Sequence, residues 1–314
     1  MRNSESILTR FFDVWIRVFG LLVIFFLPLH YAFIPDQTPI TELIFGDAVH
    51  GLSGAIIDQD LGANTYYSDS VSTFSLYLIL ILLSACLSVA AIKLIAADVR
   101  QKISEVIGMT VTYFIAYQIL RYGFDKVFIG QFYEPTAFVL NSNFGQLDRD
   151  LLYWSVMGLS PGYSAFLGIV ELAAATLILW SRTRTLGLVL VSGVMLNVVA
   201  INFGFDISVK MFSLLLLTLS LGLLRPFLSK LLDVFFLNKS AQVDSTLLRG
   251  IGVSPRIRIL HVVICSFLVF DAIYPIVSGD VISDFNKPSP TTKAESDDAP
   301  ALKKQWHWFI ENVE

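Results

Sequence analysis

A glutamate stands in the middle of a long hydrophobic run, PGYSAFLGIVELAAATLILW. About ten residues of this run lie on either side of Glu171, so its carboxyl group is expected near the centre of a membrane. Because an ionised side chain costs about 3 kcal/mol at that depth, Glu171 must be either protonated or paired with a cation from a neighbouring helix. It is then either a structural tie between helices or a proton donor and acceptor that faces an internal cavity.

A second group of polar residues lies in the run MLNVVAINFGFDISVKMFS. Asn197 is inside an apolar stretch, whereas Asn202, Asp206 and Lys210 recur every four residues, a spacing that stacks side chains on one face of a continuous helix. Gly204 favours a break instead, and a bend there would turn Asp206 and Lys210 toward the protein interior. The simpler alternative is a loop salt bridge between these two residues.

A third group lies in RYGFDKVFIGQF, which contains Arg121, Asp125, Lys126 and Gln131. Arg121 and Asp125 are four residues apart and could simply pair, while Lys126 could extend to the lipid headgroups. The alternative is a shared pocket, because the second and third groups come to the same leaflet under the topology described below. Several polar groups at one depth, on three helices, favour such a pocket.

The composition of the chain is typical of an integral membrane protein. Of 314 residues, 55% are hydrophobic and 15% are charged, and the mean hydropathy is +0.68, which is far from the composition of a soluble domain. A net charge of -4 argues against a nucleic-acid partner, since such binding needs clustered Lys and Arg. Cys86 and Cys265 each lie singly in an apolar run, so neither a disulfide scaffold nor a metal site is expected. The four histidines are also scattered singly: His30, His50, His261 and His307.

Windows of about 20 apolar residues predict about seven transmembrane helices and therefore an all-α, polytopic membrane helix bundle. The windows cover residues 14–34, 72–94, 105–124, 162–181, 185–204, 209–227 and 259–279. Membrane lipids are thus the first expected partners.

Most of the Lys and Arg residues fall in loops on one side of this bundle, which predicts a cytoplasmic N-terminus and a periplasmic C-terminus in a bacterial inner membrane. The outer side then holds an acidic loop at 36–72 without Lys or Arg, and an aromatic stretch at 125–160 that is expected on the membrane surface.

The chain is accordingly divided into four parts. Residues 1–104 hold two transmembrane helices and the acidic loop, and residues 105–230 hold a four-helix core. Residues 231–280 hold a cytoplasmic loop and the seventh helix. Residues 281–314 form a periplasmic linker and a short amphipathic tail.

The stretch RYGFDKVFIGQFYEP, followed by YWSVMGLSPGYSAFLGIVELAAATLILWSRTRTLGLVLVSGVMLNVVAINFGFDISVKMFSLLLL, resembles the DoxX-like family of bacterial integral membrane proteins, particularly its longer Bacteroidetes members. The resemblance covers about residues 110–227 and implies a four-helix membrane core. The family takes its name from a subunit of a thiosulfate:quinone oxidoreductase, and another relative is linked to an envelope thiol-redox complex. Carried over by position, its polar signature would be Arg121, Lys126, Gln131, Glu171, Asn197, Asn202, Asp206 and Lys210.

The resulting hypothesis is an integral subunit of a quinone-linked oxidoreductase that acts at the periplasmic face. Quinone reduction needs an apolar slot for the ring and a proton source beside its oxygens. The predicted catalytic residues are Glu171 and Asp206. The predicted residues for binding substrate or quinone are Arg121, Lys126, Gln131, Asn197, Asn202 and Lys210.

A different class of function is the alternative: a non-catalytic membrane protein that anchors or assembles an envelope complex with a partner protein. The sequence has no flavin, haem or dinucleotide motif and no paired cysteines, which favours this alternative. A transporter is less well supported, since no inverted repeat or pair of broken helices is evident.

Overall fold

The computed structural model describes residues 7–237, apart from 30–32, 34, 58–63, 67 and 133, together with residues 255–278. The regular structure of this part is entirely helical, which confirms the predicted all-α fold. The linker and tail predicted for residues 281–314 lie outside the described residues.

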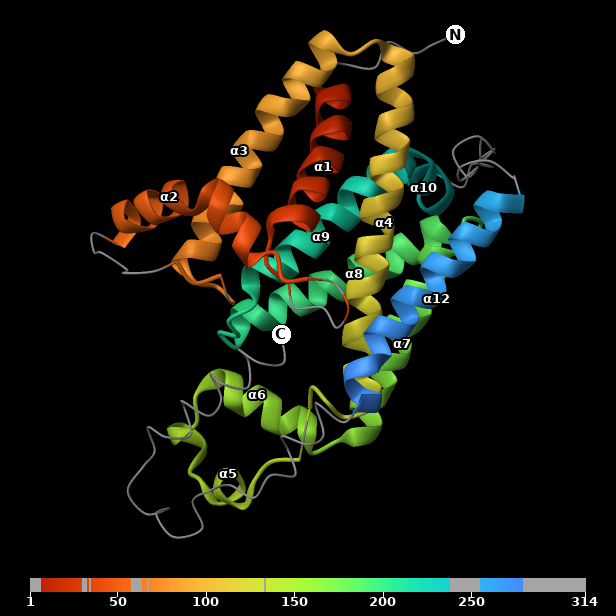
Figure 1. Ribbon diagram of the computed structural model, residues 1–314. Coiled ribbons are helices and arrows are strands. Elements are labelled where there is room, and N and C mark those ends of the chain that lie inside the picture. Colours follow the sequence, from red (N-terminus) through yellow and green to blue (C-terminus); the bar gives the residue numbers. More distant parts are fainter. Residues whose placement is uncertain are drawn as a thin grey trace.

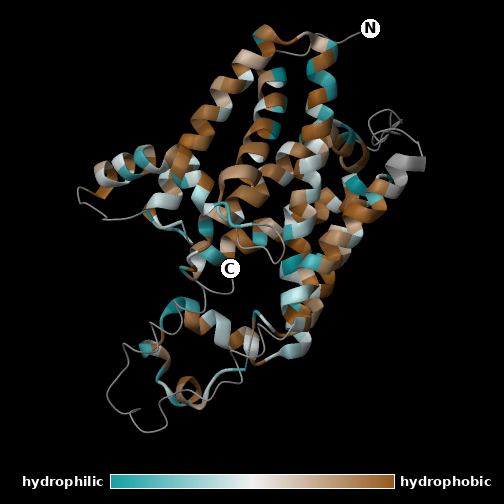
Figure 2. Ribbon diagram, in the orientation of Figure 1, coloured by the Kyte–Doolittle hydropathy of each residue, from teal (hydrophilic) through white to brown (hydrophobic). Residues whose placement is uncertain are grey.

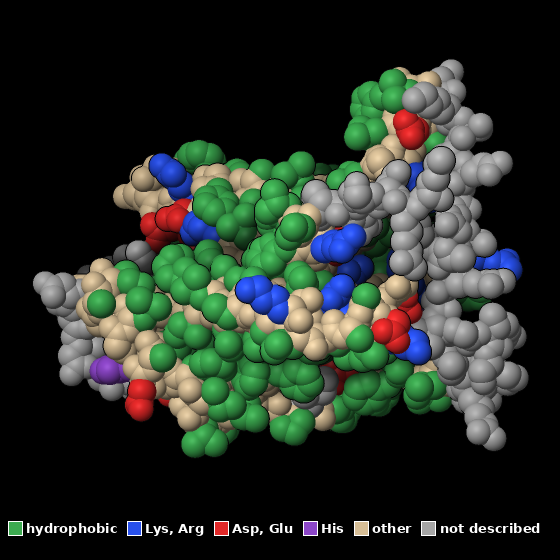
Figure 3. Space-filling view, turned by 90° about the horizontal axis from the view of Figure 1, so that it is seen from above, with side chains coloured by type: hydrophobic (Ala, Val, Ile, Leu, Met, Phe, Trp, Pro, Cys, Tyr) green, Lys and Arg blue, Asp and Glu red, His purple; other side chains and the backbone are tan. Residues whose placement is uncertain are grey.

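Seven helical segments in the described part are long and apolar enough to cross a membrane, which confirms a polytopic membrane protein. They are α2 (Thr38–Ile57), α3 (Val71–Leu94), α4 (Ala97–Val127), α7 (Pro161–Leu179), α8 (Arg184–Gly204), the segment of α9 (Lys210–Leu224) and α10 (Leu228–Phe235), and the part of α12 (Pro255–Ser278) from Leu260 on. Hydrophobic residues run along most of each long helix (Figure 2). In the view of Figure 3 they cover much of the described surface, and charged side chains form isolated spots.

The N-terminal third differs from the sequence prediction in two ways. The helix predicted at 14–34 is α1 (Ile7–Phe26), which begins and ends earlier and is not among the seven candidate spans. The predicted acidic loop at 36–72 contains α2, so the first part of the chain holds three helices and not two. The acidic residues Glu42 and Asp47 concealed α2 in the sequence, because they interrupt an otherwise apolar run.

Two charged residues of α1 have partners inside the protein. Asp13 accepts a 2.6 Å ion-paired hydrogen bond from Arg225, which follows α9, and Arg17 donates to the backbone carbonyl of Asp13 at 2.8 Å. The apolar side of α1 buries Ile16, Phe19 and Val23. The helix therefore belongs to the bundle, lying between α3 and α4 in Figure 1.

Helix α4 is the centre of the bundle, since it packs against α1, α3, α7, α9 and α12. Its middle buries Val111, Ile115 and Ile119 almost completely. Helix α4 runs beside α7 and beside α12, and α7 and α8 form a hairpin joined by a short turn (Figure 1). This arrangement places the lower end of α4 against α7, where the site lies.

The chain between α4 and α7 forms a separate small lobe at the bottom of Figure 1. It contains two short helices, α5 (Ala137–Asn141) and α6 (Arg149–Gly158). Helix α6 packs against α7, which brings its aromatic residues toward the end of α4.

Candidate functional site

A buried ion pair joins α4 to α7. The Nζ atom of Lys126 lies 2.9 Å and 2.8 Å from the two carboxylate oxygens of Glu171, and the two residues are only 6% and 4% exposed. The structure therefore pairs Glu171 with a cation. Lys126 points inward, so the simpler expectation, that it extends to the lipid headgroups, is wrong. Lys126 also lies over the ring of Tyr122, 5.4 Å from its centroid.

Two glycines allow the helices to approach closely enough for this pair. A Cβ atom on Gly168 would lie 2.5 Å from the carbonyl oxygen of Gly123, so the two backbones are in contact. Each glycine precedes its charged residue by three positions, which places the ion pair about one turn from this contact. The small residues thus bring Lys126 and Glu171 together away from water.

A tight turn after α4 directs Gln131 back toward the pair. The backbone N–H groups of Gly130 and Gln131 both donate to the carbonyl of Asp125, at 2.7 Å and 3.1 Å. Ile129 adopts a φ of 61°, a left-handed conformation that is strained for a β-branched residue. Such strain is retained only where the surroundings enforce it, so the position of Gln131 depends on the packing around it.

A partly open cavity of about 90 Å³ adjoins the ion pair. Its polar lining consists of Lys126, Glu171, Gln131, Trp154 and Asn202, with two tyrosine hydroxyls and one serine nearby, and the rest is apolar. Two polar atoms in this lining, Oε1 of Gln131 and Nε1 of Trp154, are buried without a hydrogen-bond partner among the described residues. Since buried polar atoms are nearly always paired, these two mark a place for a ligand or for water.

Aromatic residues close the cavity on the side of α6. The ring of Phe132 lies 5.0 Å from that of Trp154, and Tyr153 lies 4.9 Å from Phe205, between centroids. Burial raises the pKa of Tyr153 to about 12, with smaller contributions from Tyr163 and Glu171. Its hydroxyl therefore stays protonated at neutral pH and remains a hydrogen-bond donor.

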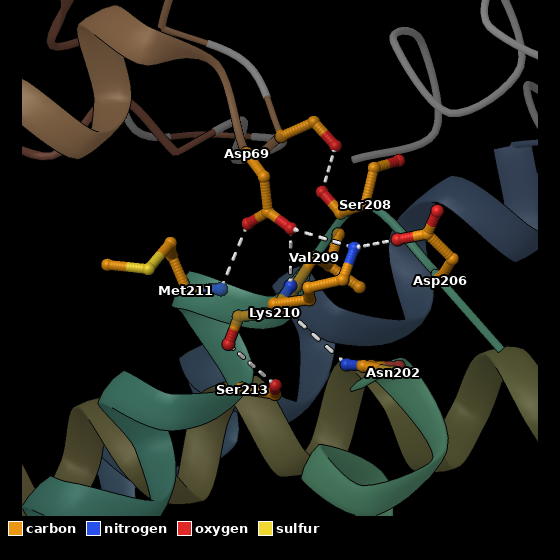
Figure 4. Close-up of polar contacts among 9 residues, drawn as sticks. Asp69, Asn202, Asp206, Ser208, Val209, Lys210, Met211 and Ser213 are labelled. Atoms are coloured by element: carbon orange, nitrogen blue, oxygen red, sulfur yellow. Dashed lines mark hydrogen bonds and ion pairs between the residues drawn. The ribbon is translucent and has the colours of Figure 1, made fainter. Parts of the chain in front are cut away.

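The second predicted group forms a different structure, shown in Figure 4. Asp69, which precedes α3, accepts hydrogen bonds from the backbone N–H groups of Lys210 at 2.8 Å and Met211 at 2.9 Å, and so caps the N-terminus of α9. The ammonium group of Lys210 lies 2.8 Å from a carboxylate oxygen of Asp206 and 3.9 Å from one of Asp69. Lys210 is thus held between two carboxylates.

The break at Gly204 turns Asp206 outward. Helix α8 ends at Gly204, and Asp206 has a φ of 57° and a side chain that is 76% exposed. The hydrogen bond from Lys210, together with its charge, holds the pKa of Asp206 below its ordinary value. Asp206 therefore stays ionised in a loop salt bridge, which argues against the predicted role as an interior proton donor.

Helix geometry explains which of the other predicted residues reach the cavity. Asn202 is 4% exposed and lines it, and its amide donates to the carbonyl of Val209 at 3.4 Å. Asn197 precedes Asn202 by five residues on α8, a rotation of about 140°, and is exposed on another face. Arg121 has the same offset from Lys126 on α4 and does not line the cavity.

Of the eight predicted residues, the cavity brings together four and leaves four outside. Lys126, Gln131, Glu171 and Asn202 line it, whereas Arg121, Asn197, Asp206 and Lys210 do not.

Sequence reasoning did not include Tyr153 and Trp154 among the site residues. The aromatic stretch at 125–160 was a signal for a surface segment, but nothing in it indicated that α6 folds back over the end of α4. Within the described part of the chain, no cluster of three or more His, Cys, Asp or Glu residues could hold a metal ion.

Comparison with known proteins gives one relative by sequence. No family model matches the chain, and no solved structure matches it. The DoxX-like resemblance therefore stays a prediction. Over 136 residues the chain is 35% identical to the uncharacterized protein YwoB of Bacillus subtilis (strain 168), a match that covers 43% of this chain and 86% of that protein. With this identity over nearly the whole of the shorter protein, the chain belongs to the same family as YwoB.

Proposed function

We propose that this chain is an integral subunit of a quinone-linked oxidoreductase in the bacterial inner membrane, and that its cavity binds the headgroup of a quinone. One observation carries the proposal: an apolar cavity beside a buried Lys126–Glu171 pair contains two further polar atoms, on Gln131 and Trp154, that lack partners among the described residues. A ligand that satisfies both atoms in this arrangement supplies a hydrogen-bond acceptor and a donor and is otherwise apolar, as a quinol is, and a quinone fits once the Gln131 amide has rotated.

The charge of the site favours a neutral ligand over an anion. Lys126 is neutralised by Glu171, and Lys210, which lies outside the cavity, is paired with Asp206. A quinone oxygen can accept from Nε1 of Trp154, and the hydroxyl of a quinol can donate to Oε1 of Gln131. Because rotation of the Gln131 amide exchanges its acceptor and donor atoms, one side chain can serve both redox forms.

The size of the cavity limits how a ring would enter. Its volume of about 90 Å³ is smaller than the roughly 150 Å³ of an apolar cavity that holds benzene. A quinone ring would therefore place one polar edge against the pair and leave the opposite edge, with its isoprenoid tail, in the open mouth.

The chemistry divides between this chain and a partner protein. Reduction of the quinone takes two electrons and two protons. In the proposal, the electrons come from a partner that oxidises a small reduced compound, such as a sulfur anion, at the periplasmic face. The Lys126–Glu171 pair provides exchangeable protons at the cavity wall, where charge developing on the quinone oxygen needs a cation.

Binding of a short-chain quinone to the purified full chain in lipid nanodiscs tests this proposal. Saturable quenching of tryptophan fluorescence is expected in the wild type, and Trp154→Phe should remove the quenched component. Gln131→Leu should weaken binding about threefold to tenfold, the effect of one hydrogen bond. Asn197→Leu, on an exposed face of α8, is the matched control and should bind as the wild type does. Quenching that does not saturate, identical in wild type and Trp154→Phe, together with no quinone in lipid extracts, would refute the proposal.

A second candidate function is supported by the geometry of the ion pair, in which both carboxylate oxygens already have a partner. Lys126 contacts both oxygens of Glu171 at the closest approach of α4 and α7, as a purely structural tie would. In that case the protein anchors or assembles an envelope complex without chemistry of its own. A single dominant partner in a mild-detergent pull-down, unchanged in Trp154→Phe and Gln131→Leu, would favour this function.

A further inference from the structure

A second carboxyl group is buried in the bundle, at the seam between α12 and α4. Asp271 is 1% exposed and lies near the middle of the candidate span Leu260–Ser278. One of its oxygens accepts a hydrogen bond from the backbone N–H of Phe33 at 3.0 Å, and the other is hydrogen-bonded to the hydroxyl of Tyr117. Tyr117 lies nine residues before Lys126 on α4 and so projects from the opposite side of that helix. This site is therefore separate from the cavity and does not depend on the proposed function.

The surroundings of Asp271 are aromatic and supply no cation from the described residues. The ring of Phe33 stacks on Phe270 with centroids 5.5 Å apart and meets Tyr274 edge-on at 4.7 Å, which covers the carboxyl group. Among the described residues, no Lys, Arg or His side chain forms a hydrogen bond or ion pair with Asp271, in contrast to Glu171 with its lysine.

The seam holds hydroxyl, imidazole and thiol groups together with two arginines: Arg184 faces Tyr113, His261 and Cys265, and Arg121 follows Tyr117 by one turn on α4. Helix α4 contributes Tyr117 and, one turn earlier, Tyr113, whose hydroxyl is hydrogen-bonded to Nδ1 of His261 on α12. Helix α12 itself contributes Tyr274, His261 and Cys265, and Phe33, before α2, contributes its backbone N–H. Tyr113 and Tyr117 share one face of α4, so the seam holds a row of exchangeable protons within an apolar interface.

An ionised carboxyl group without a cation is costly in a bilayer, so a buried acid in this position needs hydrogen-bond partners or a bound proton. The Tyr117 hydroxyl can either donate to the carboxylate or accept from the carboxylic acid. The contact therefore survives a change of protonation state, whereas the lysine partner of Glu171 can only donate. We propose that Asp271 is an intramembrane proton-binding site whose carboxyl group exchanges a proton through Tyr117.

Infrared difference spectroscopy of the full chain in lipid nanodiscs tests this proposal directly. At about pH 7, where an exposed aspartate is ionised, the wild type should show the carbonyl band of an un-ionised carboxylic acid. The band should disappear in Asp271→Asn, shift in frequency in Tyr117→Phe, and persist in the double variant Lys126→Met/Glu171→Leu, the matched control, which lacks the other buried carboxyl group and leaves no buried charge unpaired. A band that is the same in wild type and Asp271→Asn would overturn the proposal, as would the absence of any such band.

A second measurement needs no variant. A hydrophobic carbodiimide reacts with buried protonated carboxyl groups by adding the acid O–H across its C=N bond, and mass spectrometry locates the adduct. Labelling of Asp271 that falls as the pH rises, and that added Na⁺ does not suppress, is the expected result. Labelling that Na⁺ suppresses at constant pH would assign the site to a metal cation instead, and no labelling of Asp271 at any pH would overturn the proposal.

Discussion

Removing one member of the Lys126–Glu171 pair should destabilise the protein far more than removing both. Their side chains are 8% and 6% exposed and lie 2.8 Å apart, so water screens neither charge. Lys126→Met leaves a buried carboxylate without a cation, and Glu171→Leu leaves a buried ammonium without an anion. Each change should cost about 3–5 kcal/mol, the usual cost of leaving a buried charge unpaired. The double variant restores neutrality and should return to within about 1–2 kcal/mol of the wild type.

The assay is a double-mutant cycle in the free energy of unfolding, measured with the four forms in lipid bicelles. Lys210→Met is the control, since its partner Asp206 is mostly exposed, and the unfolding midpoint should change little. The folded double variant should also fail to bind quinone if the pair has a functional role. Single variants that each cost less than about 1 kcal/mol, or costs that simply add in the double variant, would refute the reasoning.

Three further outcomes follow from the local geometry. Gly168→Ala should separate α7 from α4 and cost about 1–3 kcal/mol of unfolding free energy, because its methyl group would lie 2.5 Å from a backbone oxygen, whereas Gly193→Ala, which meets open space, should be neutral or stabilising. Asp69→Ala should cost about 1–2 kcal/mol in thermal or denaturant unfolding, because it removes both hydrogen bonds that cap α9. The pKa of Tyr153 is raised to about 12 from the ordinary 10, so the native state holds its proton more tightly; the resulting stability is complete below pH 10 and is lost as the pH rises to about 12. Tyrosinate absorbance titrations of wild type and Tyr153→Phe would check this, and a titrating component near pH 10 that disappears in the variant would contradict it.

The positions of most apolar helices along the chain could be predicted from the sequence, whereas the direction of a side chain around its helix was harder to predict. The apolar run around Glu171 indicated that its carboxyl group is either protonated or paired with a cation, but for such a cation Arg121, Lys126 and Lys210 were all expected at a compatible depth. Only the helical phase separates the first two, since about 140° of rotation divides Arg121 from Lys126. The same rotation divides Asn197 from Asn202 on α8, so these two side chains cannot line one cavity on a straight helix.

Other features depended on tertiary packing that no local pattern reports. Helix α2 was missed because Glu42 and Asp47 outweighed its apolar residues. The cavity wall formed by Trp154 requires the segment after α4 to fold back, and the turn at Ile129 that allows this is strained and has no sequence signature. The buried position of Asp271, by contrast, could have been predicted, because the argument used for Glu171 applies equally to an aspartate in the middle of VVICSFLVFDAIYPIV.

The two buried acids, Glu171 and Asp271, are stabilised in different ways inside an apolar bundle. They also lie far apart in the sequence. Glu171 is held by a lysine at the junction of α4 and α7, whereas Asp271 is held only by a hydroxyl and a backbone N–H from the described residues. The match to YwoB extends over 136 residues, and Lys126 and Asp271 are 145 positions apart, so that match cannot contain both sites. At most one of them is therefore inherited through the shared stretch. A function that requires both sites would be a property of the longer chain, because α12 must dock on α4 to bury Asp271 at all.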